Sequence, residues 1–166
     1  FNSLQDLVTE IPGTYDGKNA LVKTNIGEAL LYGFEYSIDY RLMNQINIYN
    51  TLSYVRGLNQ KDDQDLPQIS PLNSIIGIEY FPLEWMSADF SSIIFAEQNK
   101  VAPGEKTTPG YATFNFKLNF INLNLGSTKA GFSAGVENMF DKEYRNHLST
   151  NRGSITTEPG RNFFLR

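Results

Sequence analysis

The stretch that decides the fold is GFSAGVENMFDKEY, residues 131–144. Its first half alternates apolar side chains with small or charged ones: Phe132, Ala134 and Val136 against Ser133, Gly135 and Glu137. A two-residue period of this kind is typical of a β-strand with one apolar face. The alternation ends at Asn138, where the chain turns polar. Either a protein core or lipid must cover the apolar face, and that choice decides what kind of protein this is.

The same alternation recurs along the chain and predicts an antiparallel meander of about eight strands. The expected strands are residues 29–40, 46–56, 73–81, 85–97, 111–120, 129–140 and 160–166. A weak additional strand is expected around Leu4, Leu7, Val8 and Ile11, followed by an irregular loop up to Asn25. The connections alternate between short turns and long polar loops. We therefore expect all tight turns at one end of an all-β fold and all large loops at the other.

Composition excludes several classes of function. The 166 residues carry a net charge of -4, which argues against a general nucleic-acid binder. The absence of Cys excludes disulfides and thiolate sites, and a single His excludes a multi-histidine metal site within the chain. No apolar run approaches the length of about 20 residues that a membrane-spanning helix needs. No nucleophile elbow, phosphate loop or dinucleotide fingerprint occurs, so we expect no enzyme activity, cofactor or metal site.

Two architectures suit a meander of amphipathic strands. A soluble β-sandwich buries its apolar faces between two sheets, whereas an outer-membrane barrel turns them towards lipid and lines its lumen with polar groups. The strand lengths, near the ten or so residues needed to cross a bilayer, and the one-sided loop lengths favour the barrel. Charged residues occupy the polar faces in mid-strand: Glu35, Asp39, Glu79, Asp89, Lys117 and Glu137. Aromatic residues near the strand ends are candidates for interfacial girdles: Tyr40, Tyr54, Tyr80, Trp85, Tyr111 and Tyr144.

Four segments resemble signatures of TonB-dependent outer-membrane receptors, in the expected order from residue 25 to the end. They are NIGEALLYGFE at 25–35, LPQISP at 66–71, VENMFDKEY at 136–144 and EPGRNF at 158–163. In the third segment, Met139 replaces the usual Leu of the family. The motif residues that carry the resemblance are Gly33, Glu35, Glu137, Asn138, Phe140, Asp141, Tyr144, Pro159, Gly160 and Arg161. Gly33 and Gly135 fall on the polar face, where we expect the missing side chains to leave room for a plug.

The resemblance implies the C-terminal portion of a receptor barrel, which in the complete protein has about 22 strands closed by an N-terminal plug. It implies a place in the outer membrane of a Gram-negative bacterium and import of a scarce nutrient, above all a ferric siderophore or other iron chelate, energised by TonB. The implied partners are the TonB complex, outer-membrane lipid, the barrel assembly machinery and the nutrient chelate. The chain departs from the family pattern because it has no plug or TonB box. We therefore expect residues 1–166 to be a piece of a longer protein.

Ligand contacts are expected in the last long loop. Arg145, His147 and Arg152 offer cationic groups for an anionic ferric chelate, and imidazole also binds metal or haem. A solvated loop is the plainer interpretation of these residues. The acidic run at 61–65 lacks the glycine and distal Glu of an EF-hand and is expected to be a solvated loop tip. Two alternatives to the receptor stay open: a soluble β-sandwich that binds a ligand or partner, and a small self-contained eight-stranded outer-membrane barrel.

Overall fold

The computed structural model describes residues 2–5, 8–25, 27–126, 128–151 and 155–166. Within these residues the chain is almost entirely β-strand, with one five-residue helix, α1 His147–Asn151. No helix there is long and apolar enough to cross a membrane. The strands are β1 Asn2–Gln5, β2 Val8–Tyr15, β3 Lys18–Asn25, β4 Glu28–Met43, β5 Ile46–Asn59, β6 Gln64–Asp65, β7 Asn73–Leu83, β8 Met86–Phe95, β9 Tyr111–Leu125, β10 Thr128–Glu137 and β11 Asn162–Leu165.

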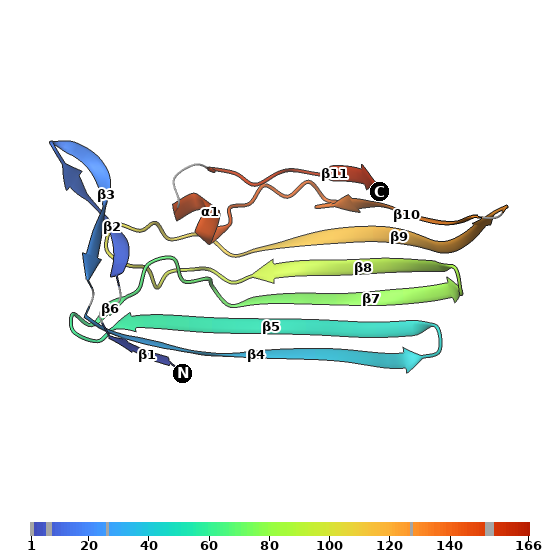
Figure 1. Ribbon diagram of the computed structural model, residues 1–166, viewed down its shortest axis with the longest axis horizontal. Helices are drawn as coiled ribbons and strands as arrows, with labels where there is room; N and C mark the ends of the chain where they lie inside the picture. The colour runs from blue at the N-terminus through green and yellow to red at the C-terminus, as the bar shows by residue number, and fades with distance from the viewer. Residues whose placement is uncertain (1, 6–7, 26, 127, 152–154) are drawn as a thin grey trace.

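The main sheet is a single antiparallel layer of nine strands. Its order is β1-β4-β5-β7-β8-β9-β10-β11, with the short β6 paired to β5. Tight turns join β4 to β5, β7 to β8 and β9 to β10 at one end, whereas the long loops and α1 lie at the other (Figure 1). The predicted meander and the predicted separation of short turns from long loops are therefore confirmed.

The register places the predicted apolar positions on one continuous face. Phe34 lies opposite Tyr54 on β5, and Ile78 on β7 lies opposite Phe90 on β8. The face continues to the far edge through the cross-strand pairs Phe90–Phe116, Phe116–Val136 and Val136–Phe163. Stacked aromatic pairs on this face, such as Phe120 and Phe132 with ring centroids 4.5 Å apart, reinforce the ladder.

This apolar face is not covered by protein. Phe34 is 53% exposed, and Ile76, Ile78, Phe90 and Ile94 are each at least 40% exposed. In the described part of the chain only three hydrophobic residues are fully buried: Ala29, Leu66 and Ala102. A β-sandwich would bury this face against a second layer. The structure has no such layer among the described residues, so the soluble-sandwich alternative is wrong.

The segment expected to be an irregular loop, residues 13–25, forms most of a hairpin instead. β2 and β3 pair over residues 8–25 as a separate two-stranded sheet. Asp16 and Gly17 both have positive φ, 52° and 71°, as a type I′ turn requires. The weak strand expected near residues 4–11 is in fact two strands, β1 in the main sheet and β2 in the hairpin; Leu7 lies outside the described residues.

The expected aromatic girdle is only partly correct. Tyr40, Tyr54 and Tyr80 share the apolar face by register. Tyr111 does not, because it pairs with Phe95 on the opposite, polar face and stacks on it at 5.0 Å. Tyr144 lies in the last loop and packs against Tyr111 at 4.4 Å. These two tyrosines therefore stabilise the loop region and do not face the surroundings of the apolar band.

Candidate functional site

Three long connections form what we call the loop end: residues 60–72, 96–110 and 138–161. Most of the fully buried side chains outside the strands lie here. They are Leu66, Pro71, Gln98, Ala102, Thr108, Asn138 and His147. Polar side chains predominate in this set, so the loops are held by hydrogen bonds to specific groups more than by an apolar core.

Asn138, directly after β10, joins the two ends of the last loop. Its side-chain Oδ1 accepts from the backbone N–H of Lys142 at 2.9 Å, and its Nδ2 donates to the carbonyls of Lys142 at 2.8 Å and Pro159 at 3.4 Å. Its own N–H donates to Asn115 Oδ1 at 2.9 Å. The residue is 5% exposed and has φ 47°, a conformation that Asn tolerates better than most residues.

Asp141 makes a second contact across the same loop. Its Oδ1 accepts from the N–H of Arg161 at 2.8 Å. A Cβ at Gly160 would lie 2.7 Å from this oxygen, so the carboxylate occupies the space that a side chain would need. Glu137 and Asn162 add a side-chain bond of 3.2 Å. The residues of VENMFDKEY and EPGRNF thus hold each other, and we name this group the loop clasp: Glu137, Asn138, Asp141, Pro159, Gly160, Arg161 and Asn162.

Glu105 connects all three long loops at a second point. Its Oε1 accepts from the N–H of Gln68 at 2.8 Å and lies 3.4 Å from Nε2 of His147, while its Oε2 accepts from the N–H of Ala102 at 3.2 Å. On the other side of the imidazole, Nδ1 lies 3.1 Å from Oγ1 of Thr108. The His147 side chain is 1% exposed and the Glu105 side chain 6%. We name Glu105, Thr108 and His147 the loop node.

The loop node favours the ionised carboxylate. Burial alone would raise the pKa of Glu105, but the hydrogen bonds from His147, Gln68 and Ala102 outweigh burial and hold that pKa below its ordinary value. A carboxylate with three donors around it is a stable anchor at neutral pH. The node therefore fixes the position of α1, which begins at His147, relative to the other two loops.

The expected ligand residues are divided by the structure. Arg145 is exposed on the last loop, so it is accessible to a solute. His147 is buried in the loop node, which contradicts the interpretation of this residue as solvated. Arg152 lies outside the described residues. No group of three or more His, Cys, Asp or Glu side chains that could hold a metal ion occurs in the described ranges. The role of Arg145, His147 and Arg152 in ligand contact stays a prediction.

The polar face of the sheet carries a hydrogen-bonded network in mid-strand. Tyr49 donates to Asp89 Oδ2 at 2.7 Å, Ser87 donates to Glu79 Oε1 at 3.2 Å, and Asn119 donates to Ser87 at 3.1 Å. Glu79 and Asp89 lie directly opposite each other, and Lys117 lies opposite Asp89 on the next strand. The predicted charged positions therefore do share one face.

Glycines on this face make room for neighbouring groups of the same chain. A Cβ at Gly135 would lie 2.7 Å from the Phe164 ring, and one at Gly77 would overlap the Tyr49 ring. A Cβ at Gly33 would overlap the backbone carbonyl of Tyr54, and Glu35, two residues on, accepts from Ser53 at 3.1 Å. Gly33 and Gly135 lie on the polar face as predicted, but the expected reason, room for a plug, is wrong at Gly135, where Phe164 fills the space.

Phe140 is the one motif residue that stands clear of these contacts. It is 66% exposed and meets Phe114 edge-on, with ring centroids 5.4 Å apart. It extends the apolar face beyond the end of β10. Sequence reasoning missed Glu105, Thr108 and Asn115, because their partners lie 23 to 42 residues away and no local pattern marks them.

Comparisons with known proteins agree with this architecture. The sequence matches the family model described as "TonB dependent receptor-like, beta-barrel" over residues 1–139. No curated protein sequence matches the chain. Among solved structures, the copper transporter OprC superposes with a TM-score of 0.84 and 26% identity over 98% of this chain. A mutant of the ferric enterobactin receptor PfeA from Pseudomonas aeruginosa gives 0.66 and 17% over 97%, which supports the fold alone.

The chain spans only 27% and 26% of the lengths of these two structures. The family match nevertheless covers most of the sequence. Members of this family are outer-membrane receptors and transporters that work with TonB and bind nutrient ligands. The chain belongs to the TonB-dependent receptor-like β-barrel family and lies in the outer membrane of a Gram-negative bacterium.

Proposed function

We propose that the chain forms the C-terminal part of the barrel of a TonB-dependent receptor, which imports a scarce metal nutrient as an iron chelate such as a ferric siderophore. The observation that carries this proposal is the division of the main sheet into two faces. One face is apolar and uncovered, as lipid contact requires, while the other carries Glu35, Glu79, Asp89 and Lys117, as a wet lumen permits. In this proposal the main sheet is part of the barrel wall and the loop end is part of the opening of the barrel, and the chain has no enzyme active site.

The loop end supports the mouth of such a receptor. The loop clasp and the loop node fix the three long loops by buried hydrogen bonds, so that groups such as Arg145 are presented from a rigid base. A guanidinium suits anionic chelates because it offers several donors in a fixed plane. In this proposal His147 acts by positioning α1, and Arg145 is the residue that touches the ligand.

Copper is the second candidate cargo. The structure with 26% identity and a TM-score of 0.84 is a copper transporter, whereas the iron-chelate receptor has only 17% identity. The described residues do not offer three clustered His, Cys, Asp or Glu side chains for a bare ion. A chelate recognised through its anionic surface needs no such cluster.

The remaining partners follow from the same proposal. The TonB complex would act through the part of the receptor that lies outside this chain. The barrel assembly machinery would insert the strands, and lipid would cover the apolar face. No nucleic-acid partner is proposed, because the net charge of the chain is -4.

A growth experiment tests the cargo. A strain that lacks the complete receptor gene is grown under iron limitation with ferric chelates supplied one at a time, and in parallel under copper limitation. We expect one chelate to restore growth only when the intact gene is present. If the intact gene restores growth only under copper limitation, copper is the favoured cargo. If the strain without the receptor loses uptake while TonB is intact, the receptor itself is required.

The role of Arg145 is tested in the same strain. Arg145→Gln in the complete receptor is expected to weaken uptake of the chelate about tenfold, because a charged hydrogen bond is lost. Lys129→Gln, at the turn end of β10, is the matched control. Equal uptake by both variants would contradict the contact while leaving the transport proposal standing.

A further inference from the structure

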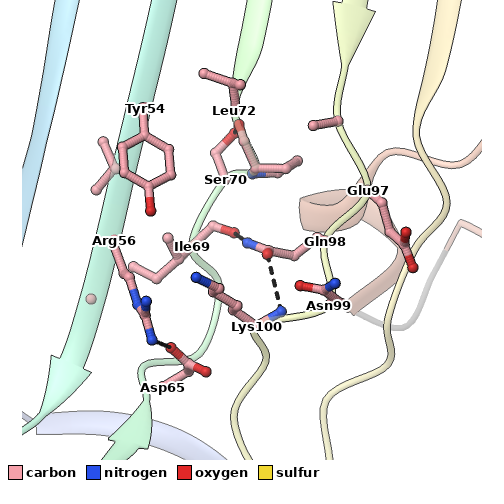
Figure 2. A pocket seen from close by; sticks show the side chains of 14 residues that line it. Tyr54, Arg56, Asp65, Ile69, Ser70, Leu72, Glu97, Gln98, Asn99 and Lys100 are labelled. Carbon is pink, nitrogen blue, oxygen red and sulfur yellow. Dashed lines mark hydrogen bonds and ion pairs between the residues drawn. The ribbon is translucent and has the colours of Figure 1, made fainter.

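A small cavity opens where the ladder between β5 and β7 ends. The two strands pair only as far as Ser53 and Asn73, and beyond this point the loop leaves the sheet. The resulting gap has a volume of about 120 Å³. Figure 2 shows the polar side chains that surround it, from β5, β6 and the loop after β8. They include Tyr54, Arg56, Asp65, Gln98 and Lys100.

The cavity holds polar atoms without hydrogen-bond partners. Arg56 Nη2 lies 3.3 Å from Asp65 Oδ1, but the buried Arg56 Nε–H has no acceptor, and Asp65 Oδ1 accepts no hydrogen bond. A donor and an acceptor left open side by side cost free energy unless water or another molecule satisfies them. Such a molecule must both accept from a guanidinium and donate to a carboxylate.

The other wall of the cavity is fixed. Gln98, 7% exposed, donates from Nε2 to the carbonyl of Ile69 at 2.8 Å and accepts from the N–H of Lys100 at 3.3 Å. This places the exposed Lys100 at the rim, and its side chain extends across the cavity towards Arg56 in Figure 2. A second cation thus faces the unpaired guanidinium N–H.

The cavity lies on the lipid side of the sheet. Tyr54 and Arg56 lie opposite Phe34 and Tyr32 on β4, so both belong to the apolar face. Along this face towards the tight turns, the band continues through Leu52, Ile76 and Ile94, the last two exposed by 46% and 40%. The order is therefore apolar band, then tyrosines, then Arg56 and Lys100, which matches the passage from hydrocarbon to headgroups.

We propose that this cavity binds the phosphorylated sugar headgroup of a lipid in the outer leaflet. The phosphate accepts from Arg56 Nε–H and from the Lys100 ammonium, and a sugar hydroxyl donates to Asp65 Oδ1. The acyl chains lie along Ile76 and Ile94. A headgroup that carries both phosphate and hydroxyl satisfies the open donor and the open acceptor together, which an anion without a hydroxyl group does not.

Lipid retention by the complete receptor tests this assignment. The purified receptor is placed in nanodiscs of phosphatidylcholine with either lipid A or phosphatidylglycerol, and co-purifying lipid is measured by native mass spectrometry. We expect preferential retention of lipid A. Lys100→Gln and Arg56→Gln are each expected to reduce that retention about tenfold, the effect of losing a charged hydrogen bond. Lys61→Gln, an exposed lysine of the loop at residues 60–72 that does not line the cavity, is the matched control.

Three outcomes would overturn the proposal. If phosphatidylglycerol is retained as well as lipid A, the binding is general attraction between an anionic lipid and the basic side chains. Displacement of lipid A by millimolar inorganic phosphate would assign the site to free phosphate. Unchanged retention in Lys100→Gln, a residue at the exposed rim whose loss leaves the Arg56–Asp65 ion pair intact, would remove the cavity from lipid binding even if Arg56→Gln perturbs the loop.

Discussion

The main sheet and the loop end of this chain reverse the arrangement of a soluble protein. In the sheet, large apolar side chains such as Phe34 and Ile78 stay exposed, and backbone ladders hold the strands together. In the loops, Asn138 and His147 are buried at 5% and 2% exposure and bonded on several sides. The sheet thus depends for its stability on the medium that covers its apolar face, whereas the loops are stabilised by hydrogen bonds within the chain. Four predictions test this difference.

The largest effect is expected for a charge on the apolar face. Ile78→Arg places a guanidinium where lipid lies, at a cost of about 2–4 kcal/mol near the middle of the bilayer. Thr51→Arg, on the polar face of neighbouring β5, is the matched control and is expected to cost much less. Unfolding of the complete receptor by denaturant in lipid vesicles measures both. Equal costs would show that the two faces do not differ in environment.

Next in size is the loss of the Asn138 side chain. Asn138→Ala removes three partly buried hydrogen bonds, from the N–H of Lys142 and to the carbonyls of Lys142 and Pro159, at about 0.5–1.5 kcal/mol for each bond. Hydrogen exchange at the amides of Lys142 and Arg161 is expected to accelerate strongly. Asn162→Ala, which removes one exposed bond to Glu137, serves for comparison. Similar exchange in both variants would mean that burial adds nothing to the clasp.

A smaller effect is expected inside the sheet at Gly77. Gly77→Ala pushes the added methyl group into the Tyr49 ring and displaces the Tyr49 hydroxyl from Asp89, at about 1–3 kcal/mol. In a Tyr49→Ser background the same change is expected to be nearly neutral. A double-mutant cycle of unfolding free energies measures this coupling. Additive costs would show that the ring and the glycine do not share space.

The smallest effect is the pH dependence of the loop node. The folded pKa of Glu105 is lowered from 4.5, so its contribution is complete above pH 4.5 and is lost as the pH falls through the lower, folded value. The variant Pro103→Cys can carry a single spin label in this chain, because the chain has no other cysteine. The mobility of that label is expected to increase only below pH 4.5, where the Glu105 carboxylate becomes protonated. Glu105→Gln is expected to make that mobility independent of pH in this range. A transition near neutral pH would point to a different group.

The faces of the sheet were predictable because alternation is a local property. Phe132, Ala134 and Val136 could be assigned to one face from their spacing, and the register extended that face across every neighbouring strand. The hairpin at 8–25 was missed because Pro12-Gly13 resembles a turn, although it lies within β2. The Asp16-Gly17 pair, which forms the hairpin turn, is of the type that favours two-residue hairpin loops, and this preference was not used in the prediction.

The loop contacts were not predictable from the sequence. The motif residues at 136–144 and 158–163 were identified, but nothing in their spacing showed that Asp141 would occupy the empty side of Gly160. His147 looked like an accessible ligand because loops are usually solvated. Its burial depends on Glu105 and Thr108, which approach it only after the sheet has brought two loops together. Long-range polar contacts of this kind leave no periodic pattern.

The contact between Phe164 and Gly135 bears on the sequence of events during insertion. Until β11 arrives, the inner wall at β10 has an unfilled notch at Gly135, and the Asn138 amide lacks its bond to Pro159. Docking of one short strand completes both at once. A molecule in which β11 is unpaired would therefore lack both the side chain that covers Gly135 and one of the bonds that closes the last loop.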